Sequence, residues 1–394
     1  MLHVDKVDSL MAEKVKISAS RLTPFLNYKF ELRLYSANGI LRSYCILKSD
    51  ERGKIELSTA KPIRGTYLDP DPMGLFMTVE RTDDVSYGDM IKNYEAEPFY
   101  YSLRLFSESG ELLDEVNLKK RRHHPLVTEI EVKQDGIWGV IYKPPGPGPF
   151  PCIIDTPVVD GRLCKSHAPL FASEGFLSFC FPMFDEPGLP KTLEDVDIEY
   201  LSKHIKYVQS LPYCSDRIGL YGISFAGLIA HHLATKHPEL KAVATTNGPG
   251  AFYTLFSDLM RRLRPETSIK WDHISKNITF RVLSSIDDWL VDGVTNGAYR
   301  DNLLKTGHRV EIDFVNSGHV TVIPYNPHHS FGFNKFLNVN LGFGGETSAH
   351  GKVQETAWEK HINFFKKHLG TPKSLPNYER DTMISIPRRT GSKL

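Results

Sequence analysis

Ser224 lies in a segment whose pattern predicts a sharp turn between a strand and a helix. The residues from Arg217 to Ala226 read R-I-G-L-Y-G-I-S-F-A, and their apolar start is typical of a buried strand. The following residues, Leu228 to Lys236, are typical of a helix that stops before Pro238. A serine on such a turn is held in a strained backbone conformation that lifts its hydroxyl clear of both elements. The segment therefore indicates a nucleophile elbow, with an ordinary turn of small residues as the alternative.

The residues two positions before and after Ser224 must be small, because the helix packs closely against the strand at this point. Gly222 and Ala226 meet this requirement. The usual pattern has glycine at both positions, so the packing around the turn must absorb the extra methyl group of Ala226.

A serine hydroxyl is a weak nucleophile near neutral pH and needs a histidine base, which an acid in turn orients. In α/β hydrolases the acid and then the histidine follow the serine along the chain. Two segments qualify: S-I-D-D-W-L, with Asp287 and Asp288, and N-S-G-H-V, with His319. Both follow predicted strands, where the catalytic groups of open α/β sheets collect. We predict Asp288 as the acid, since it comes a short turn after the strand, and expect Asp287 to hydrogen-bond that turn.

Attack by this serine on a carbonyl would create an oxyanion, which backbone N–H groups would stabilise. The first expected donor is Phe225, at the start of the predicted helix. The second should come from the loop D-T-P-V-V-D-G-R, which follows the first strand of the sheet. Pro157 has no N–H group, so the second donor is Val158 or Val159.

The composition is that of an ordinary soluble protein, with 394 residues, 41% apolar residues, 24% charged residues and a net charge of +1. This length exceeds what one hydrophobic core usually serves, so two domains are expected. The small net charge argues against a nucleic-acid-binding protein. Because no stretch approaches the roughly 20 apolar residues of a membrane span, and the N-terminus lacks the apolar run of a signal peptide, we expect an intracellular protein.

The cysteines and histidines outside the predicted triad do not indicate a metal site. The five cysteines are scattered and lack C-x-x-C spacing, which predicts reduced thiols. His328, His329 and His350 have no cysteine or acidic partner at ligand spacing. We therefore expect neither a metal nor a cofactor.

The chain divides into three predicted parts. Residues 1–125 contain short alternating segments separated by turn residues, among them L-F-M-T-V-E at 75–80, and predict an all-β, sandwich-like domain. Residues 126–370 contain a proline-glycine corner and then apolar strands that alternate with helices, which predicts an α/β-hydrolase domain. Residues 371–394 are polar and proline-bearing, which predicts a flexible tail.

Two further segments have alternative interpretations. The basic run K-K-R-R-H-H, from Lys119 to His124, is typical of a solvated linker, and it could also attract an anionic substrate that carries phosphates. An insert from about Phe252 to Asn277 is either a cap over the active site or a surface helix.

From about Val15 to Leu369 the chain resembles the type I acyl-CoA thioesterases and their relatives, the bile acid-CoA:amino acid N-acyltransferases. The similar motifs are G-T-Y-L-D-P-D-P-M-G-L, P-P-G-P-G-P-F-P-x-I-I-D, L-P-K-T, G-I-S-F-A-G, S-G-H and the closing stretch from Gly344 to Leu369. The resemblance implies Ser224, Asp288 and His319 as the triad. The family commonly has Lys and Gly where this chain has Phe225 and Ala226.

The resemblance implies that the substrate is an acyl-CoA, with coenzyme A as part of the substrate rather than a cofactor. The first expectation is hydrolysis to a free fatty acid and coenzyme A. The alternatives are transfer of the acyl group to an amino acid and an inactive relative that only binds acyl-CoA. The transferases of the family resemble one another in carrying cysteine at the elbow, so Ser224 favours hydrolysis.

The chain ends in Ser392-Lys393-Leu394, the S-K-L tripeptide that the peroxisomal import receptor reads. The polar residues before it should leave this tripeptide free for the receptor to bind. We therefore expect a peroxisomal protein.

Overall fold

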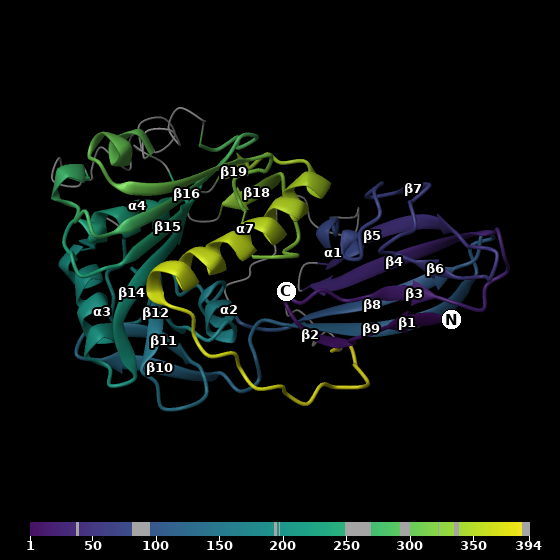
Figure 1. The fold of residues 1–394 in the computed structure, drawn as a ribbon, viewed down its shortest axis with the longest axis horizontal. Coiled ribbons are helices and arrows are strands. Elements are labelled where there is room, and N and C mark those ends of the chain that lie inside the picture. The colour runs from purple at the N-terminus through teal and green to yellow at the C-terminus, as the bar shows by residue number, and fades with distance from the viewer. Residues whose placement is uncertain are drawn as a thin grey trace.

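The computed structural model describes residues 1–36, 39–80, 95–192, 195–196, 198–248, 269–291, 300–321, 323–334 and 339–387. Within these ranges the chain forms a β-rich unit and a larger α/β unit, which lie side by side (Figure 1). The insert expected at residues 252–277 lies mostly outside the described residues. The tripeptide Ser392-Lys393-Leu394 lies wholly outside them.

The β-rich unit has a larger sheet with the strand order β2-β9-β8-β4-β5-β7 and a smaller one with the order β1-β3-β6. Its strands are β1 (Leu2–Val4), β2 (Asp8–Leu10), β3 (Ile17–Ala19), β4 (Asn27–Ser36), β5 (Gly39–Lys48), β6 (Ile55–Glu56), β7 (Arg64–Gly65), β8 (Phe99–Phe106) and β9 (Leu112–Arg121). The prediction of a β-rich N-terminal region is therefore confirmed.

Alternation along the strands builds the core of this unit. Phe30 and Leu34 of β4 pair with Cys45 and Leu41 of β5, and all four side chains are fully buried. Successive side chains of a strand point to opposite faces, so the apolar positions of both strands meet on one side of the sheet.

The predicted strand at residues 75–80 is wrong. The segment begins as a short helix, α1 (Gly74–Met77), and ends in a single bridge between Glu80 and Arg42. All four residues of α1 are buried, so this segment has no solvent-facing positions of the kind that a half-buried strand shows. A short continuous apolar run does not by itself distinguish a strand from a helix.

The α/β unit contains an eight-stranded sheet with the order β10-β11-β13-β12-β14-β15-β16-β17. Its strands are β10 (Thr128–Gln134), β11 (Ile137–Lys143), β12 (Phe150–Asp155), β13 (Leu177–Cys180), β14 (Cys214–Ile223), β15 (Ala242–Thr246), β16 (Thr279–Ser285) and β17 (Arg309–Val315). In this sheet β11 is antiparallel to both of its neighbours, and every pairing from β13 to β17 is parallel. The predicted α/β-hydrolase fold is therefore confirmed.

Helices cover both faces of this sheet. They are α2 (Ala168–Ser173), α3 (Ile198–Ser210), α4 (Phe225–Ala234) and α7 (Thr347–Leu369). Ile218 and Leu220 of β14 pack in one apolar cluster with α3 and α4, whereas Tyr221 packs in another with α2 and α7. Because alternate residues of a strand face opposite sides, the two clusters lie on opposite faces of the sheet.

Helix α7, which runs across the front of the α/β unit in Figure 1, was not predicted from the sequence. Its first turn is capped by Glu346, whose carboxylate accepts from Ser348 N (3.0 Å) and Ala349 N (2.7 Å). The helix is followed by Gly370, with φ of 88°. A 3₁₀ turn (Trp271–His273) and a hairpin of β18 (Phe331–Asn334) and β19 (Val339–Gly342) complete the described elements.

The prediction that Lys119 to His124 form a solvated linker is wrong. The run begins inside β9, and both Lys120 and Arg122 are 1% exposed. The Lys120 ammonium donates to the carbonyl oxygens of Leu10 (3.2 Å) and Glu13. Burial lowers the pKa of Lys120 to about 7. Side-chain burial of this kind depends on the neighbouring strands. A run of basic residues in the sequence does not show which strands will lie beside it.

Residues 371–387, the first part of the predicted flexible tail, have no helix or strand, and they pass from the end of α7 below the α/β unit to the β-rich unit (Figure 1). Arg380 pairs with Glu13 (Nη2–Oε1, 2.7 Å), and Asp381 pairs with Lys119 (2.9 Å). These pairs join the tail to the β-rich unit, although the tail composition alone predicts no partner for it. No helix in the described ranges combines the length and the apolar character needed to cross a membrane.

Candidate active site

Ser224 occupies the turn between β14 and α4, with φ of 54° and ψ of −125°. This left-handed conformation is unfavourable for a residue with a side chain and is typical of functional sites. The turn is fixed on both sides: Ser224 N donates to Thr246 O (2.8 Å), and Ser224 O accepts from Gly227 N (2.9 Å). The structure therefore has the backbone geometry that the sequence predicts for a nucleophile elbow.

The residues beside the serine are packed as closely as predicted. A Cβ atom at Gly222 would lie 2.4 Å from the carbonyl carbon and oxygen of Ala226, so glycine is required there. Ala226 is 1% exposed, which shows that the packing absorbs its methyl group. Its carbonyl oxygen accepts from the Thr156 hydroxyl (2.7 Å), so the loop after β12 is joined to the elbow.

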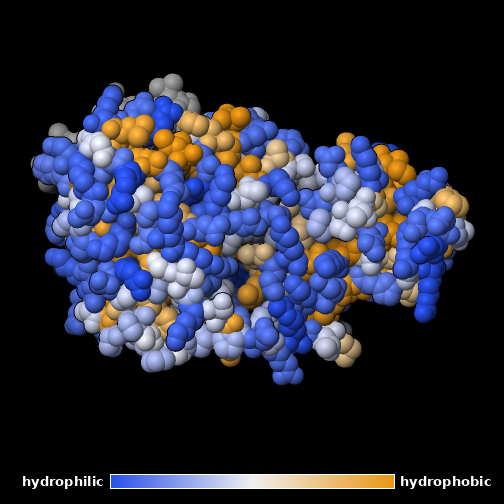
Figure 2. Space-filling view, viewed as in Figure 1, coloured by the Kyte–Doolittle hydropathy of each residue, from blue (hydrophilic) through white to orange (hydrophobic). Residues whose placement is uncertain are grey.

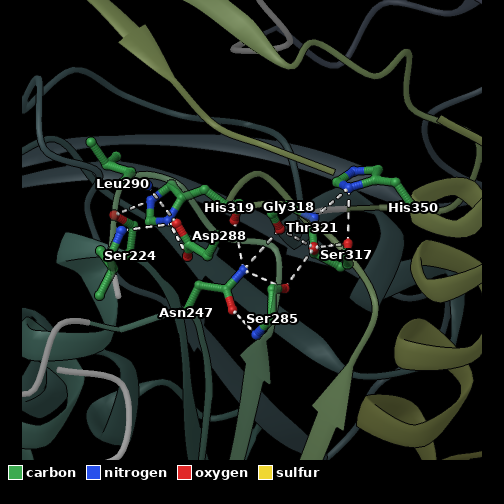
Figure 3. Close-up of polar contacts among 11 residues, drawn as sticks. Ser224, Asn247, Ser285, Asp288, Leu290, Ser317, Gly318, His319, Thr321 and His350 are labelled. Carbon is green, nitrogen blue, oxygen red and sulfur yellow. Dashed lines mark hydrogen bonds and ion pairs between the residues drawn. The ribbon is translucent and has the colours of Figure 1, made fainter. Parts of the chain in front are cut away.

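A continuous hydrogen-bonded chain joins Asp288, His319 and Ser224 (Figure 3). His319 Nδ1 lies 2.7 Å from Asp288 Oδ2, and His319 Nε2 lies 2.8 Å from Ser224 Oγ. An ionised carboxylate only accepts hydrogen bonds, so the proton of a neutral His319 is on Nδ1 and Nε2 accepts from the serine. The residues come from the ends of β14, β16 and β17, as the chain order predicts.

Asp288, the aspartate beside His319, is buried, and hydrogen-bond donors surround its carboxylate. The Asp288 side chain is 1% exposed, and its Oδ1 accepts from the backbone N–H groups of Leu290 and Val291, both at 2.8 Å. Together with His319, these groups supply three hydrogen bonds to the carboxylate. A buried charge with its hydrogen bonds made avoids the cost of an unpaired one.

Asp287 points to other partners. Its Oδ1 accepts from Trp289 Nε1 (2.7 Å), and its Oδ2 accepts from Gly345 N (3.0 Å). These bonds join the turn after β16 to the chain before α7, which agrees with the expectation that Asp287 hydrogen-bonds its turn. The geometry thus distinguishes the two neighbouring carboxylates.

The two segments expected to supply oxyanion donors lie next to each other. Phe225 is the first residue of α4, directly after the serine. Val158 lies in the loop after β12, where its carbonyl oxygen accepts from Gly161 N (2.9 Å). The contact between Thr156 and Ala226 described above joins this loop to the elbow. The roles of Phe225 and Val158, with Val159 as the alternative, remain predictions.

The sequence analysis missed a buried amide next to the triad. Asn247, at the end of β15, is fully buried and donates through Nδ2 to the carbonyl oxygens of His319 (2.7 Å) and Gly318 (3.2 Å). The dipeptide N-G after a predicted strand is a turn signal that could have drawn attention to it. The residues that Asn247 binds are distant in the sequence, so these contacts can be identified only once β15, β16 and β17 are placed side by side.

A second buried group supports the histidine loop from the other side. His350 of α7 lies with its Nδ1 2.8 Å from Ser317 Oγ and accepts there from Gly318 N (3.2 Å) (Figure 3). Burial holds the pKa of His350 well below its usual range, so the ring is neutral and able to accept. His319 N itself donates to Phe343 O (2.7 Å).

The sequence analysis also missed a second chain of serine, histidine and acid. Ser202 Oγ lies 2.6 Å from His237 Nε2, and His237 Nδ1 lies 2.8 Å from Glu239 Oε1. Ser202 is 3% exposed and lies inside α3, and His237 follows α4. In the ranges that the structure describes, no group of three or more histidine, cysteine or acidic residues could hold a metal ion.

Curated relatives match the chain along most of its length. They include the mitochondrial acyl-coenzyme A thioesterase 2 of Mus musculus, 26% identical over 91% of this chain and 87% of the relative. The peroxisomal succinyl-coenzyme A thioesterase of Mus musculus is 25% identical over 92% of this chain and 95% of the relative. The bile acid-CoA:amino acid N-acyltransferase of Mus musculus is 24% identical over 92% and 96%. One of these relatives is mitochondrial and another is peroxisomal by name, so location varies within the group.

Among solved structures, an acylaminoacyl peptidase of Pyrococcus horikoshii aligns with a TM-score of 0.46 and 12% identity, over 89% of this chain and 72% of that chain. Two family models also match. The acyl-CoA thioester hydrolase/BAAT N-terminal region matches residues 12–134, and the BAAT/acyl-CoA thioester hydrolase C-terminal model matches residues 196–255 and 251–371. The chain belongs to the family of the acyl-CoA thioester hydrolases and the bile acid-CoA:amino acid N-acyltransferases.

Proposed function

We propose that the protein hydrolyses acyl-CoA thioesters to a free acid and coenzyme A, with Ser224 as nucleophile, His319 as general base and Asp288 as the group that orients it. The observation that carries this proposal is the continuous hydrogen-bonded chain from Asp288 to a serine in the strained elbow. Membership of the acyl-CoA thioester hydrolase/BAAT family supports the choice of substrate class.

In the first half of the reaction, Ser224 Oγ attacks the thioester carbonyl carbon while His319 Nε2 takes the hydroxyl proton. The carbonyl oxygen becomes an oxyanion, which the backbone N–H groups of Phe225 and Val158 would stabilise. The carbon–sulfur bond then breaks, and the leaving sulfur takes the proton from His319. Coenzyme A departs as a thiol, and the acyl group remains as an ester on Ser224.

In the second half, a water molecule gives a proton to His319 Nε2 and attacks the acyl-ester carbonyl. The serine–acyl bond breaks, the proton returns to Ser224 Oγ, and the free acid leaves. Asp288 stays ionised throughout and stabilises the imidazolium that forms at each step.

The alternative is that an amino acid such as glycine or taurine takes the place of water. Its support is the N-acyltransferase among the relatives, and the serine at position 224 favours hydrolysis as described above. The test is to incubate the protein with acyl-CoAs of several chain lengths, with and without glycine and taurine, and to measure free thiol and acyl-amide. Thiol release without acyl-amide supports hydrolysis, and acyl-amide formation supports transfer. A wild-type protein that releases no thiol from any acyl-CoA contradicts both.

For location, we propose import into peroxisomes through binding of Ser392-Lys393-Leu394 to the import receptor. One relative, the succinyl-coenzyme A thioesterase, is peroxisomal by name, whereas another is mitochondrial. A fluorescent protein fused to the N-terminus leaves the tripeptide accessible. The fusion should co-localise with a peroxisomal marker, and deletion of the three residues should move it to the cytosol without changing turnover. A full-length fusion that stays cytosolic would refute the proposal.

A further inference from the structure

We propose that Asn247 is a positioning residue for the reaction, whose side-chain amide fixes the backbone of His319 relative to the strands that carry the nucleophile and the acid. The inference rests on the proposed function of Ser224, His319 and Asp288. It assigns Asn247 no contact with the substrate.

Asn247 lies where three elements of the sheet meet. It directly follows β15, and its backbone N–H donates to Leu283 O of β16 (2.9 Å). The carbonyl oxygen of the residue before it, Thr246, accepts from Ser224 N in the elbow (2.8 Å). A displacement of Asn247 would therefore shift both the elbow that carries Ser224 and the strand β16 that precedes Asp288.

The side-chain amide of Asn247 then reaches the third element, the loop of the histidine. Its Oδ1 accepts from Ser285 N (2.8 Å), and its Nδ2 donates to His319 O (2.7 Å). The same nitrogen lies 3.2 Å from Gly318 O and 3.0 Å from Ser285 Oγ. Carbonyl oxygens only accept and a backbone N–H only donates, so these neighbours permit one orientation of the amide. Figure 3 shows the amide between the end of β16 and the loop of His319.

The backbone of His319 is held at both of its peptide groups. Its carbonyl oxygen accepts from Asn247, and its N–H donates to Phe343 O at 2.7 Å. The imidazole projects from the same residue and must keep 2.8 Å to Ser224 Oγ and 2.7 Å to Asp288 Oδ2. A small displacement of the loop would lengthen one of these two hydrogen bonds. A misplacement of about 1 Å in such geometry costs on the order of 10²-fold in rate.

The residue type at position 247 meets two demands. Its φ of 49° lies in the left-handed region, which asparagine, aspartate and glycine tolerate better than other residues. Only asparagine among these supplies a donor and an acceptor at once without taking up a proton, in a site that is fully buried. The position therefore offers two informative substitutions that keep the backbone conformation, Asn247→Gly and Asn247→Asp.

The Asn247→Gly variant deletes the amide and should lower kcat about 10²-fold while KM changes less than about threefold, because substrate contacts are intact. The matched control is Ser202→Ala, which removes one buried hydrogen bond, to His237, away from the triad. We expect both variants to melt a few degrees lower, with normal kcat in the control alone. A kcat of Asn247→Gly within about twofold of the control would overturn the inference.

The Asn247→Asp variant adds a pH signature that loss of stability alone does not produce. A protonated carboxyl can donate to His319 O as the amide does, whereas a carboxylate cannot. The titratable groups near position 247 are His319, Asp288, His350 and His361. His361 Nε2 lies 3.1 Å from Oγ1 of the preceding residue, Thr246. Burial raises the pKa of a carboxyl group, so activity should fall as pH rises through that raised value. A pH profile of kcat parallel to that of the wild type would contradict the inference.

Labelling with a fluorophosphonate separates this inference from the proposed function, because the probe reacts with an activated serine whatever the natural substrate is. In Asn247→Gly the labelling rate of Ser224 should fall about 10²-fold relative to Ser202→Ala. If the wild type is labelled at Ser224 but hydrolyses no acyl-CoA, the proposed substrate fails and the positioning role is still tested. If wild type and Asn247→Gly are labelled at the same rate, the positioning role fails.

Discussion

Among the residues that the structure describes, two hydrogen-bonded chains of serine, histidine and acid have contacts of nearly equal length. In the first, Ser224, His319 and Asp288 are joined by contacts of 2.8 and 2.7 Å. In the second, Ser202 and His237 are joined by a contact of 2.6 Å, and Glu239 follows at 2.8 Å. Hydrogen-bond lengths alone do not tell which serine is the nucleophile.

The backbone and the surroundings of the two serines differ. Ser224 is partly exposed, has φ of 54° and precedes the first turn of α4, so a carbonyl group can approach its hydroxyl near backbone N–H groups. Ser202 is 3% exposed and lies inside α3, past the first turn, where the backbone N–H groups bond to carbonyl groups of the same helix. The acids differ in the opposite sense, since the Glu239 side chain is 41% exposed and that of Asp288 is 1% exposed.

This comparison teaches that a nucleophile needs an open approach for its substrate and an oxyanion site, in addition to a base. The second chain joins α3 to the end of α4 and therefore has the properties of a structural contact. Four tests, most of which compare two variants, examine this distinction.

The largest effect is expected for Ser224→Ala, compared with Ser202→Ala. Removal of the nucleophile should lower kcat on the order of 10⁶-fold, whereas removal of the helix serine should leave kcat unchanged. Steady-state thioester hydrolysis with both purified variants measures the difference, and circular dichroism checks that both are folded. Near-normal turnover by Ser224→Ala would refute the elbow assignment, and a large loss in Ser202→Ala would assign chemistry to the second chain.

The next effect separates the two neighbouring aspartates. In Asp288→Asn the amide can present an N–H group to His319 Nδ1 and so favour the wrong tautomer, which should lower kcat about 10⁴-fold. In Asp287→Asn one oxygen can still accept from Gly345 N or Trp289 Nε1, and the loss should stay within about tenfold because the change spares His319. Steady-state kinetics that give kcat for each variant measure both losses. The reverse ranking would move the acid to Asp287.

The residues of the candidate triad could be predicted from the sequence because each depends on a local pattern plus one rule of the fold. The small residues around Ser224 indicate the turn, and the ends of parallel strands gather at one edge of a sheet. The choice of Asp288 over Asp287 needed only its position relative to the strand end. The structure places these groups within hydrogen-bond distance, and their catalytic roles stay predictions that the variants above test.

The features that could not be predicted depend on contacts between distant segments. Asn247 acts through three elements, and the bond between Ser202 and His237 joins residues 35 positions apart. The burial of Lys120 in a basic run depends on carbonyl groups near the N-terminus. Periodicity reports which face of one element is apolar, and it does not report which polar groups another element brings to that face.

The third test concerns the elbow itself. In Gly222→Ala the new methyl group would lie 2.4 Å from backbone atoms of Ala226, so the turn must shift. We expect a loss of kcat on the order of 10²-fold together with a lower melting temperature. The control is Gly110→Ala, where φ of 87° makes the change strained although nothing lies within 4 Å of the new methyl group. The control should lose stability alone, and equal kcat losses in both variants would show that the elbow geometry is not the cause.

The smallest effect is expected for Glu239→Gln in the second chain. Burial acts to raise the pKa of Glu239, but the hydrogen bonds from His237 and Gln209 outweigh it and hold the pKa below its usual value. A carboxyl group whose pKa is lower in the folded state adds stability above its unfolded pKa, and this stability is lost as pH falls through the folded pKa. Because the side chain is 41% exposed, the contribution at neutral pH should be about 0.5 kcal/mol or less.

Urea unfolding of the wild type and Glu239→Gln at several pH values would therefore show a small difference at pH 7 that closes as pH falls through the lowered pKa of Glu239, with turnover equal in the two proteins. The corresponding change in the first chain, Asp288→Asn, alters turnover far more than stability. If Glu239→Gln instead lowered kcat by more than about tenfold, the second chain would act on the chemistry, and exposure and backbone conformation would not be what separates the two serines.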